Sequence, residues 1–164
     1  MIDKMVKNSD VVTEGIHEFI IENHETGCVS RTFYRNLIVD NGLEAICELL
    51  IPATSITTEG INFCGLGTGT TEIASSDTEL ENEGARRPRG AGLRSGLSVV
   101  VSFYFSPDDG NGTWTRYGTF FDGTSVPDSG SLFTHLEIDL TKGASEGLTI
   151  NSQYTLLDVS STGS

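Results

Sequence analysis

The chain has 164 residues, with 10 Lys or Arg against 23 Asp or Glu, which gives a net charge of −13. This length suffices for one domain with its own core, whereas the acidity argues against nucleic-acid binding because phosphate backbones repel an acidic surface. The charge favours either solubility or attraction to a basic partner, and no apolar run approaches the roughly 18 residues of a membrane span.

The N-terminal half predicts an arm, a hairpin and one helix. Residues 1–14 are polar and form the predicted arm, and they lack the apolar core of a signal peptide. Residues 15–22 and 28–39 predict two strands around a turn that contains Gly27, and therefore a β-hairpin. The predicted single domain spans residues 15–160.

One amphipathic helix follows in the segment DNGLEAICELLIP. Asn41 and Glu44 have the spacing of a capping box, and Pro52 ends the helix. Its predicted buried stripe follows the i, i+3, i+4, i+7 pattern and consists of Leu43, Ile46, Cys47 and Leu50.

The remaining chain predicts a strand, a long loop and four further strands. Residues 60–66 form the strand, and the polar stretch of about 67–95 forms a loop long enough to contact a partner. The final strands are predicted at 97–106, 113–121, 131–141 and 148–159. Alternation in the first of them places on one face Leu97, Val99, Val101, Phe103 and Phe105, and the third is predicted to direct outward His135, Glu137 and Asp139. Seven or eight strands at turn spacings of about ten residues are typical of a mainly β, antiparallel β-sandwich or jelly roll.

The glycine run of residues 65–70 (GLGTGT) first suggests a nucleotide-binding loop. It lacks the last glycine of GxGxxG, because residue 70 is Thr, and no P-loop lysine follows. We therefore interpret Gly65, Gly67 and Gly69 as a strand end that runs into a turn in which glycine is permitted.

The other candidate chemical motifs also fail in detail. The segment DDGNG at 108–112 has ligand types of a calcium loop but lacks its twelfth-position glutamate, so a hairpin turn is preferred and a weak cation site stays an alternative. The three histidines share no metal motif, and no GxSxG occurs. The three cysteines, Cys28, Cys47 and Cys64, predict buried free thiols of a protein assembled in a reducing cytosol. We expect no enzyme, no metal and no cofactor.

An arginine cluster is the unusual feature of the predicted loop. Four of the ten basic residues fall within nine positions, after a run of acidic ones, and they are Arg86, Arg87, Arg89 and Arg94. They form either local salt bridges, which contribute little when exposed, or a docking site for the acidic surface of another subunit. Contact with nucleic acid is a less favoured alternative amid this acidity.

The order of several short motifs resembles a diverse group of small bacteriophage structural proteins. These motifs are NLIVDNGL at 36–43, GLGTGTT at 65–71, DTELENE at 77–83 followed by Arg86, GTFF at 118–121 and GSLF at 130–133. The likeness covers about residues 26–158 and lies in motif order and spacing. One departure is RYGTF at 116–120, where the group usually has an acidic residue before G-L-F.

The resemblance implies a virion component without catalytic activity, found in the particle after assembly in the host cytoplasm. The expected role is tail-associated, at the baseplate, collar or fibre attachment, and the alternative is a capsid decoration protein. The expected partners are other virion proteins and further copies of the chain, with no nucleic acid and no membrane. A carbohydrate-binding receptor module is a third possibility, with Trp114, Tyr104 and Tyr117 as the candidate contacts.

Overall fold

The computed structural model describes residues 11–50 and 60–158, and it is mainly β, with 61% of these residues in strands and one short helix. No helix within these ranges is long and apolar enough to cross a membrane. The elements are β1 (Val11–Asn23), β2 (Val29–Arg35), β3 (Leu37–Ile38), α1 (Asp40–Leu50), β4 (Ile61–Gly67), β5 (Glu83–Ser95), β6 (Ser98–Phe105), β7 (Gly112–Phe121), β8 (Ser131–Lys142) and β9 (Glu146–Asp158).

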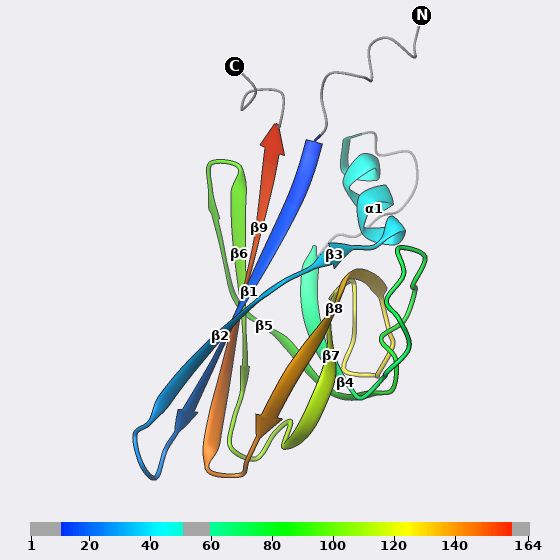
Figure 1. The fold of residues 1–164 in the computed structure, drawn as a ribbon. Coiled ribbons are helices and arrows are strands. Elements are labelled where there is room, and N and C mark those ends of the chain that lie inside the picture. Colours follow the sequence, from blue (N-terminus) through cyan, green and yellow to red (C-terminus); the bar gives the residue numbers. More distant parts are fainter. Residues whose placement is uncertain (1–10, 51–59, 159–164) are drawn as a thin grey trace, which may run out of the picture.

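All strand pairs are antiparallel, and the strands form one nearly closed sheet in the order β2-β1-β9-β6-β5-β4-β7-β8-β3. Figure 1 shows two halves: the first half consists of β2, β1, β9 and β6, and the second half of β4, β7, β8 and β3. The chain passes between the halves four times. Two of these crossings are the turns between β6 and β7 and between β8 and β9. The other two are the long strand β5 and the run from β2 through Asn36 into β3.

Strand β5 passes from the second half of the sheet to the first in its middle. Its residues up to Pro88 pair with β4, and its residues from Arg89 onward pair with β6, with a register irregularity between Arg89 and Ala91. Proline has no N–H for a ladder and is tolerated where a strand is irregular. The predicted loop of about 67–95 is therefore wrong in its second part, because residues 83–95 form this bent strand.

The core lies between the two halves and is rich in aromatic rings. Phe19 of β1 and Phe103 of β6 face Tyr117 of β7 and Phe133 of β8 in one buried cluster. The alternation predicted for β6 is confirmed over Val101, Phe103 and Phe105, whose side chains are buried. The pattern ends where β6 projects beyond the core, and Leu97 is exposed there.

A second, smaller cluster covers the outer face of the second half. Phe120 and Leu132 on neighbouring strands pack with Val39 and with Leu80 from the connection that precedes β5. The helix α1 also lies against β8 (Figure 1). The second half thus has both of its faces covered, whereas the outer face of the first half has no described segment over it.

The helix and the arm differ in detail from their predictions. The helix begins at Asp40, one residue before the predicted cap, and Leu43 of the predicted stripe is 43% exposed while Ala45 is buried. Strand β1 begins at Val11, so residues 11–14 of the predicted arm belong to the sheet. Residues 1–10 and Pro52, like the side chains of Cys47 and Leu50, lie outside the described part.

Candidate functional site

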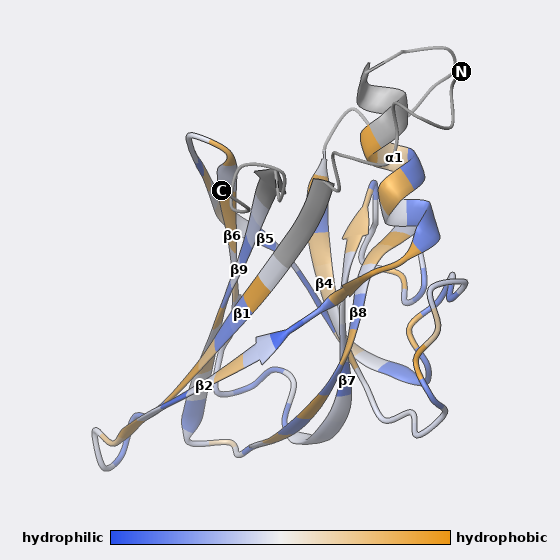
Figure 2. Ribbon diagram, turned by 45° about the horizontal axis from the view of Figure 1, so that its top comes forward, coloured by the Kyte–Doolittle hydropathy of each residue, from blue (hydrophilic) through white to orange (hydrophobic). Residues whose placement is uncertain are grey.

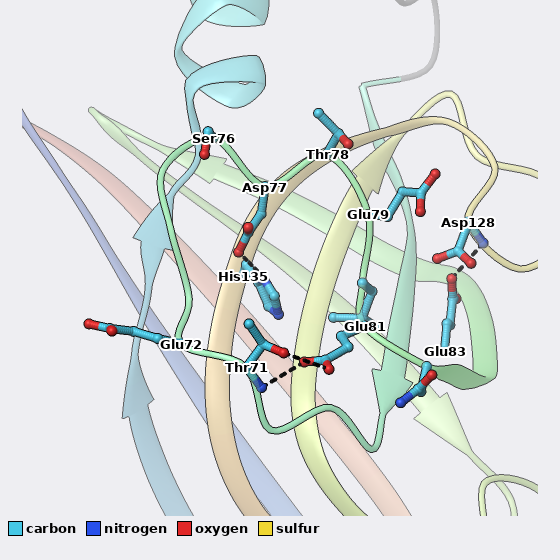
Figure 3. Close-up of a pocket in the computed structure, with 12 residues that line it drawn as sticks. Thr71, Glu72, Ser76, Asp77, Thr78, Glu79, Glu81, Glu83, Asp128 and His135 are labelled. Atoms are coloured by element: carbon cyan, nitrogen blue, oxygen red, sulfur yellow. Dashed lines mark hydrogen bonds and ion pairs between the residues drawn. The ribbon is translucent and has the colours of Figure 1, made fainter.

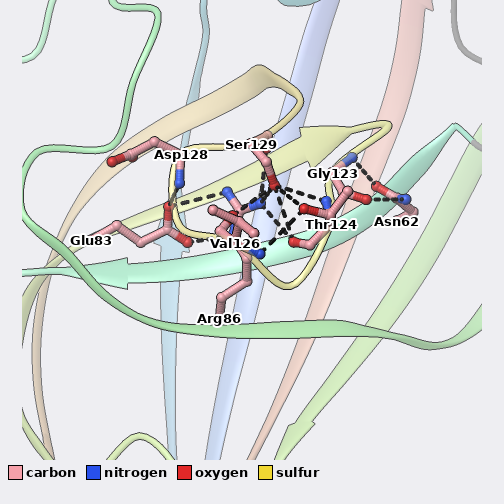
Figure 4. Close-up of polar contacts among 8 residues, drawn as sticks. All are labelled: Asn62, Glu83, Arg86, Gly123, Thr124, Val126, Asp128 and Ser129. Carbon is pink, nitrogen blue, oxygen red and sulfur yellow. Dashed lines mark hydrogen bonds and ion pairs between the residues drawn. The ribbon is translucent and has the colours of Figure 1, made fainter.

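Arg86 of the predicted docking cluster is buried and fully engaged inside the chain. Its guanidinium forms a salt bridge of 2.6 Å with Glu83, and the two side chains are 3% and 0% exposed. It also donates to the carbonyl oxygens of Thr124 (3.1 Å) and Ser129 (2.8 Å), as Figure 4 shows, and it lies 4.1 Å from the ring centroid of Phe120. The prediction that Arg86 docks a partner is therefore wrong, because the side chain ties β5 to the loop between β7 and β8.

The other three arginines of the cluster are separated by the bend in β5. Arg87 pairs with Asp109, and Arg89 donates to the carbonyl of Ile61 at 2.9 Å. Arg94 lies in an exposed position near the end of β5, two residues before Gly96 in the β5–β6 turn. The four residues do not form one exposed basic patch.

The glycine run provides close packing instead of a turn. Gly65 and Gly67 lie within β4, and none of Gly65, Gly67 and Gly69 has a positive φ. A Cβ on Gly67 would overlap the carbonyl oxygen of Glu81, and one on Gly69 would overlap the carboxylate of the same residue. These glycines allow residues 80–83 to pack directly on the strand, which corrects the interpretation of the run as a turn.

Replacing Gly67 with alanine is expected to lower the free energy of unfolding by about 1–2 kcal/mol, because the added methyl displaces the backbone of Glu81. Urea denaturation of the full chain measures the loss, and hydrogen exchange of residues 68–82 shows where it acts. The matched control is Gly90→Ala, whose Cβ would meet only a backbone oxygen at 3.6 Å. Equal losses in the two variants would contradict this role for Gly67.

The three aromatic residues considered for glycan contact do not form a surface platform. Trp114 and Tyr117 are buried, and the indole of Trp114 donates to the carbonyl of Gly110 at 2.8 Å. Tyr104 is half exposed on the outside of β6. The suggested receptor role of Trp114 and Tyr117 is therefore wrong, since both side chains serve the core.

A buried polar cluster inside the core superficially resembles a catalytic arrangement. His17 Nδ1 lies 2.8 Å from Ser152 Oγ, which lies 2.8 Å from the hydroxyl of Tyr117, and all three residues are inaccessible to solvent. Burial lowers the pKa of His17 to about 3, although a hydrogen bond to Asn36 opposes this shift. The neutral ring is enclosed by the rings of Tyr117 and Tyr154, so no substrate reaches it.

The remaining motif residues have ordinary structural roles. Cys64 is buried as predicted, but Cys28 is exposed. In the former calcium-loop candidate, Asp109 accepts a hydrogen bond from Ser106 at 2.6 Å and pairs with Arg87. Among the described residues, no group of three or more His, Cys, Asp and Glu side chains is arranged to hold a metal ion.

The outer face of the first half is the first candidate surface, here called the open face. The strand registers place the outward side chains of β2, β1, β9, β6 and the second part of β5 on it. Two of its apolar side chains, Phe33 and Leu93, are 64% and 71% exposed. Hydrophobic segments on β2 and on the β5–β6 hairpin are also visible in Figure 2.

The open face is nearly neutral in a chain of net charge −13. Its described charged residues are Arg31 and Arg35 on β2 and Glu18 and Glu22 on β1. Arg31 and Glu18 form a salt bridge of 3.0 Å across the two strands. Most of the acidic side chains therefore lie elsewhere on the molecule.

The second candidate surface is an acidic cleft of about 620 Å³ on the opposite half (Figure 3). It lies between the 68–82 connection, the start of β5 and β8. Its carboxylates are Glu72, Asp77, Glu79, Glu81, Glu83 and Asp128. Long-range packing creates the cleft, so the sequence revealed only a run of acidic residues.

Three of these carboxylates are held by the chain itself. The backbone N–H and the hydroxyl of Thr71 donate to Glu81 at 3.0 and 2.9 Å, and the backbone hydrogen bond is the main cause of a lowered pKa of Glu81. Asp77 accepts from the backbone of Ala74 at 3.0 Å. Glu83 pairs with Arg86, and burial raises its pKa despite that partner.

His135 is the buried group of this cleft. Its Nδ1 lies 2.9 Å from Asp77, its side chain is almost completely buried, and Nε2 has no hydrogen-bond partner within the described chain. Burial lowers the pKa of His135, although Asp77 opposes this shift. Sequence reasoning placed His135 on the outward side of its strand, and the connection that covers this face could not be foreseen from a local pattern.

Comparison of the chain with protein families, with curated proteins and with solved structures finds no match.

Proposed function

We propose that this chain is a non-catalytic structural subunit of a bacteriophage particle, associated with the tail, and that it associates with copies of itself through the open face. The observation that carries this proposal is the exposure of apolar side chains, above all Phe33 and Leu93, on one uncovered side of the sheet. Scattered exposed apolar residues are common, but a set on one face marks an interaction surface.

Charge supports a second copy as the occupant of this face. Two subunits of net charge −13 repel one another over most orientations. The open face carries two arginines and two glutamates among its described charged residues, so contact through it brings together the least repulsive surfaces. An isologous contact of this kind closes as a symmetric dimer and is one route to a larger symmetric assembly.

The order of the short motifs along the chain supports the assignment to the phage particle. In the fold, two of these motifs contact each other, because the DTELENE segment packs on the GLGTGTT segment. The two halves that face one another across an aromatic core also support a β-sandwich of jelly-roll type as the finer architecture.

Quantitative mass spectrometry of purified particles tests this function through the copy number of the chain relative to the major capsid protein. A few copies per hundred capsid subunits are expected for a tail component. About one copy per capsid subunit, or one per three, would replace the tail assignment with capsid decoration. Absence from particles would overturn the structural role.

The same particles test the open face. The double variant Phe33→Asp and Leu93→Asp is expected to be monomeric by light scattering and to be lost from particles, while its stability changes little because both side chains are exposed. The matched control is Val126→Asp, since Val126 is 62% exposed but lies in the loop before β8. Retention of the double variant at the wild-type level would exclude this face as the contact.

A further inference from the structure

The acidic cleft presents mainly carboxylate acceptors to solvent, and the side-chain donors in its lining include no cation. The carboxylates of Glu72, Glu79 and Asp128 are exposed, and no ion pair within the described ranges engages them. In Figure 3, Glu79 and Asp128 lie on one side of Asp77 and His135, and Glu72 lies on the other side with its carboxylate turned outward. Carboxylates are acceptors only, so the walls favour a cationic group rich in donors.

The histidine adds an acceptor that nothing in the chain satisfies. Because Asp77 accepts from Nδ1, the neutral ring of His135 carries its proton at that nitrogen and presents a lone pair at Nε2. This side chain is only 4% exposed, and a buried polar atom without a partner costs free energy unless a ligand or water supplies a donor. The unpartnered Nε2 thus points to a ligand that brings a donor.

Neither of the two buried arginines beside the cleft fills this role. Arg86 is already paired with Glu83. Arg116 donates from Nη2 to the carbonyl of Thr71 at 2.6 Å and from Nη1 to that of Thr115 at 3.0 Å, so both terminal nitrogens of its guanidinium bind the backbone beneath the cleft. The six carboxylates of the cleft outnumber these two arginines, and a net attraction for cations remains.

We infer that the acidic cleft binds a basic segment of a partner protein by accepting an arginine side chain between its carboxylates and His135 Nε2. This inference rests on the proposed function, because it names the chemistry of one partner of an assembly subunit. A planar guanidinium has five N–H donors in a fixed fork, which suits several acceptors at once better than a point charge. The open face is left for the second copy, since it belongs to the other half of the sheet.

Titration of the isotope-labelled full chain with the peptide acetyl-Gly-Arg-Gly-amide, followed by NMR, tests the inference. Shifts are expected for residues 71–83, 128 and 135, together with a change in the ¹⁵N resonance of His135 Nε2. The peptide in which citrulline replaces arginine has the same shape without the charge and is expected to bind at least tenfold more weakly. Equal binding of the two peptides would overturn the inference.

Two matched variants complete the test. The triple variant Glu72→Gln, Glu79→Gln and Asp128→Asn removes three charges from the cleft and is expected to lower the affinity about tenfold. The control Glu25→Gln, Asp108→Asn and Asp139→Asn removes three exposed charges outside both candidate surfaces and is expected to retain binding. Equal losses of peptide affinity in the two triple variants would show that binding depends only on net charge, which would refute the site. The copy number in particles does not depend on peptide binding to the cleft. Refutation of the cleft is therefore distinguishable from refutation of the proposed function.

Discussion

Replacing Arg86 with leucine is expected to lower the free energy of unfolding by roughly 3–5 kcal/mol, because it leaves the carboxylate of Glu83 buried without its cation. The loss includes the hydrogen bonds that Arg86 donates to the carbonyls of Thr124 and Ser129. Urea denaturation of the purified chain measures it. The control Arg94→Leu is expected to change the same quantity by no more than about 0.5 kcal/mol, since Arg94 is exposed.

A pH series and a double variant separate the charge effect from lost packing. Burial raises the pKa of Glu83 even beside Arg86, so the folded protein disfavours the ionised carboxylate relative to the unfolded chain. A protonated carboxyl needs no cation, and the deficit of Arg86→Leu relative to wild type should therefore shrink as the pH falls and Glu83 takes up a proton. The double variant Arg86→Met with Glu83→Gln should recover part of the loss at neutral pH. A deficit that is independent of pH would assign the effect to packing alone.

The residues whose environment is set by neighbours in sequence are the ones that sequence patterns predicted well. The alternating residues of β6 are buried where predicted, and the helix occupies nearly its predicted range. The same patterns end at the border of the core: Leu97 continues the alternation of β6, yet it is exposed because the hairpin extends past the facing half. Periodicity shows the direction of a side chain but not what lies opposite it.

The errors in the candidate site share one physical cause, which is contact between segments distant in sequence. Strand β5 has a glycine- and arginine-rich sequence with a proline, so propensity argues against a strand, and only pairing with two partners creates it. Arg86 belongs to an apparent basic cluster, but its partners include Ser129, 43 residues away. His135 is outward on its strand and becomes buried because the 68–82 connection covers that face. The acidic run itself was visible, whereas its assembly with His135 was not.

Acidification is expected to destabilise the chain through His17. Burial lowers its pKa in the folded state to about 3 from 6.5, so the folded protein keeps the ring neutral while the unfolded chain takes up a proton below pH 6.5. The contribution of this group to stability is complete above pH 6.5 and is lost as the pH falls from 6.5 towards 3. At about 1.4 kcal/mol per pH unit, the free energy of unfolding falls by about 2.5 kcal/mol between pH 6.5 and 4.5.

The variant His17→Gln isolates this contribution, because an amide can occupy the site beside Ser152 Oγ without titrating. Between pH 6.5 and 4.5, the free energy of unfolding of the variant should fall by about 2.5 kcal/mol less than that of the wild type. This difference is expected even if the variant is less stable at neutral pH. His135, whose pKa burial also lowers, titrates in the same direction and stays in both proteins, so it cancels from the difference. The control His24→Gln changes an exposed histidine in the β1–β2 turn and should keep the wild-type slope. Urea denaturation at half-unit pH steps measures how the free energy of unfolding depends on pH in the wild type and the two variants. If His17→Gln keeps the pH dependence of the wild type, the buried His–Ser–Tyr cluster does not control the acid stability.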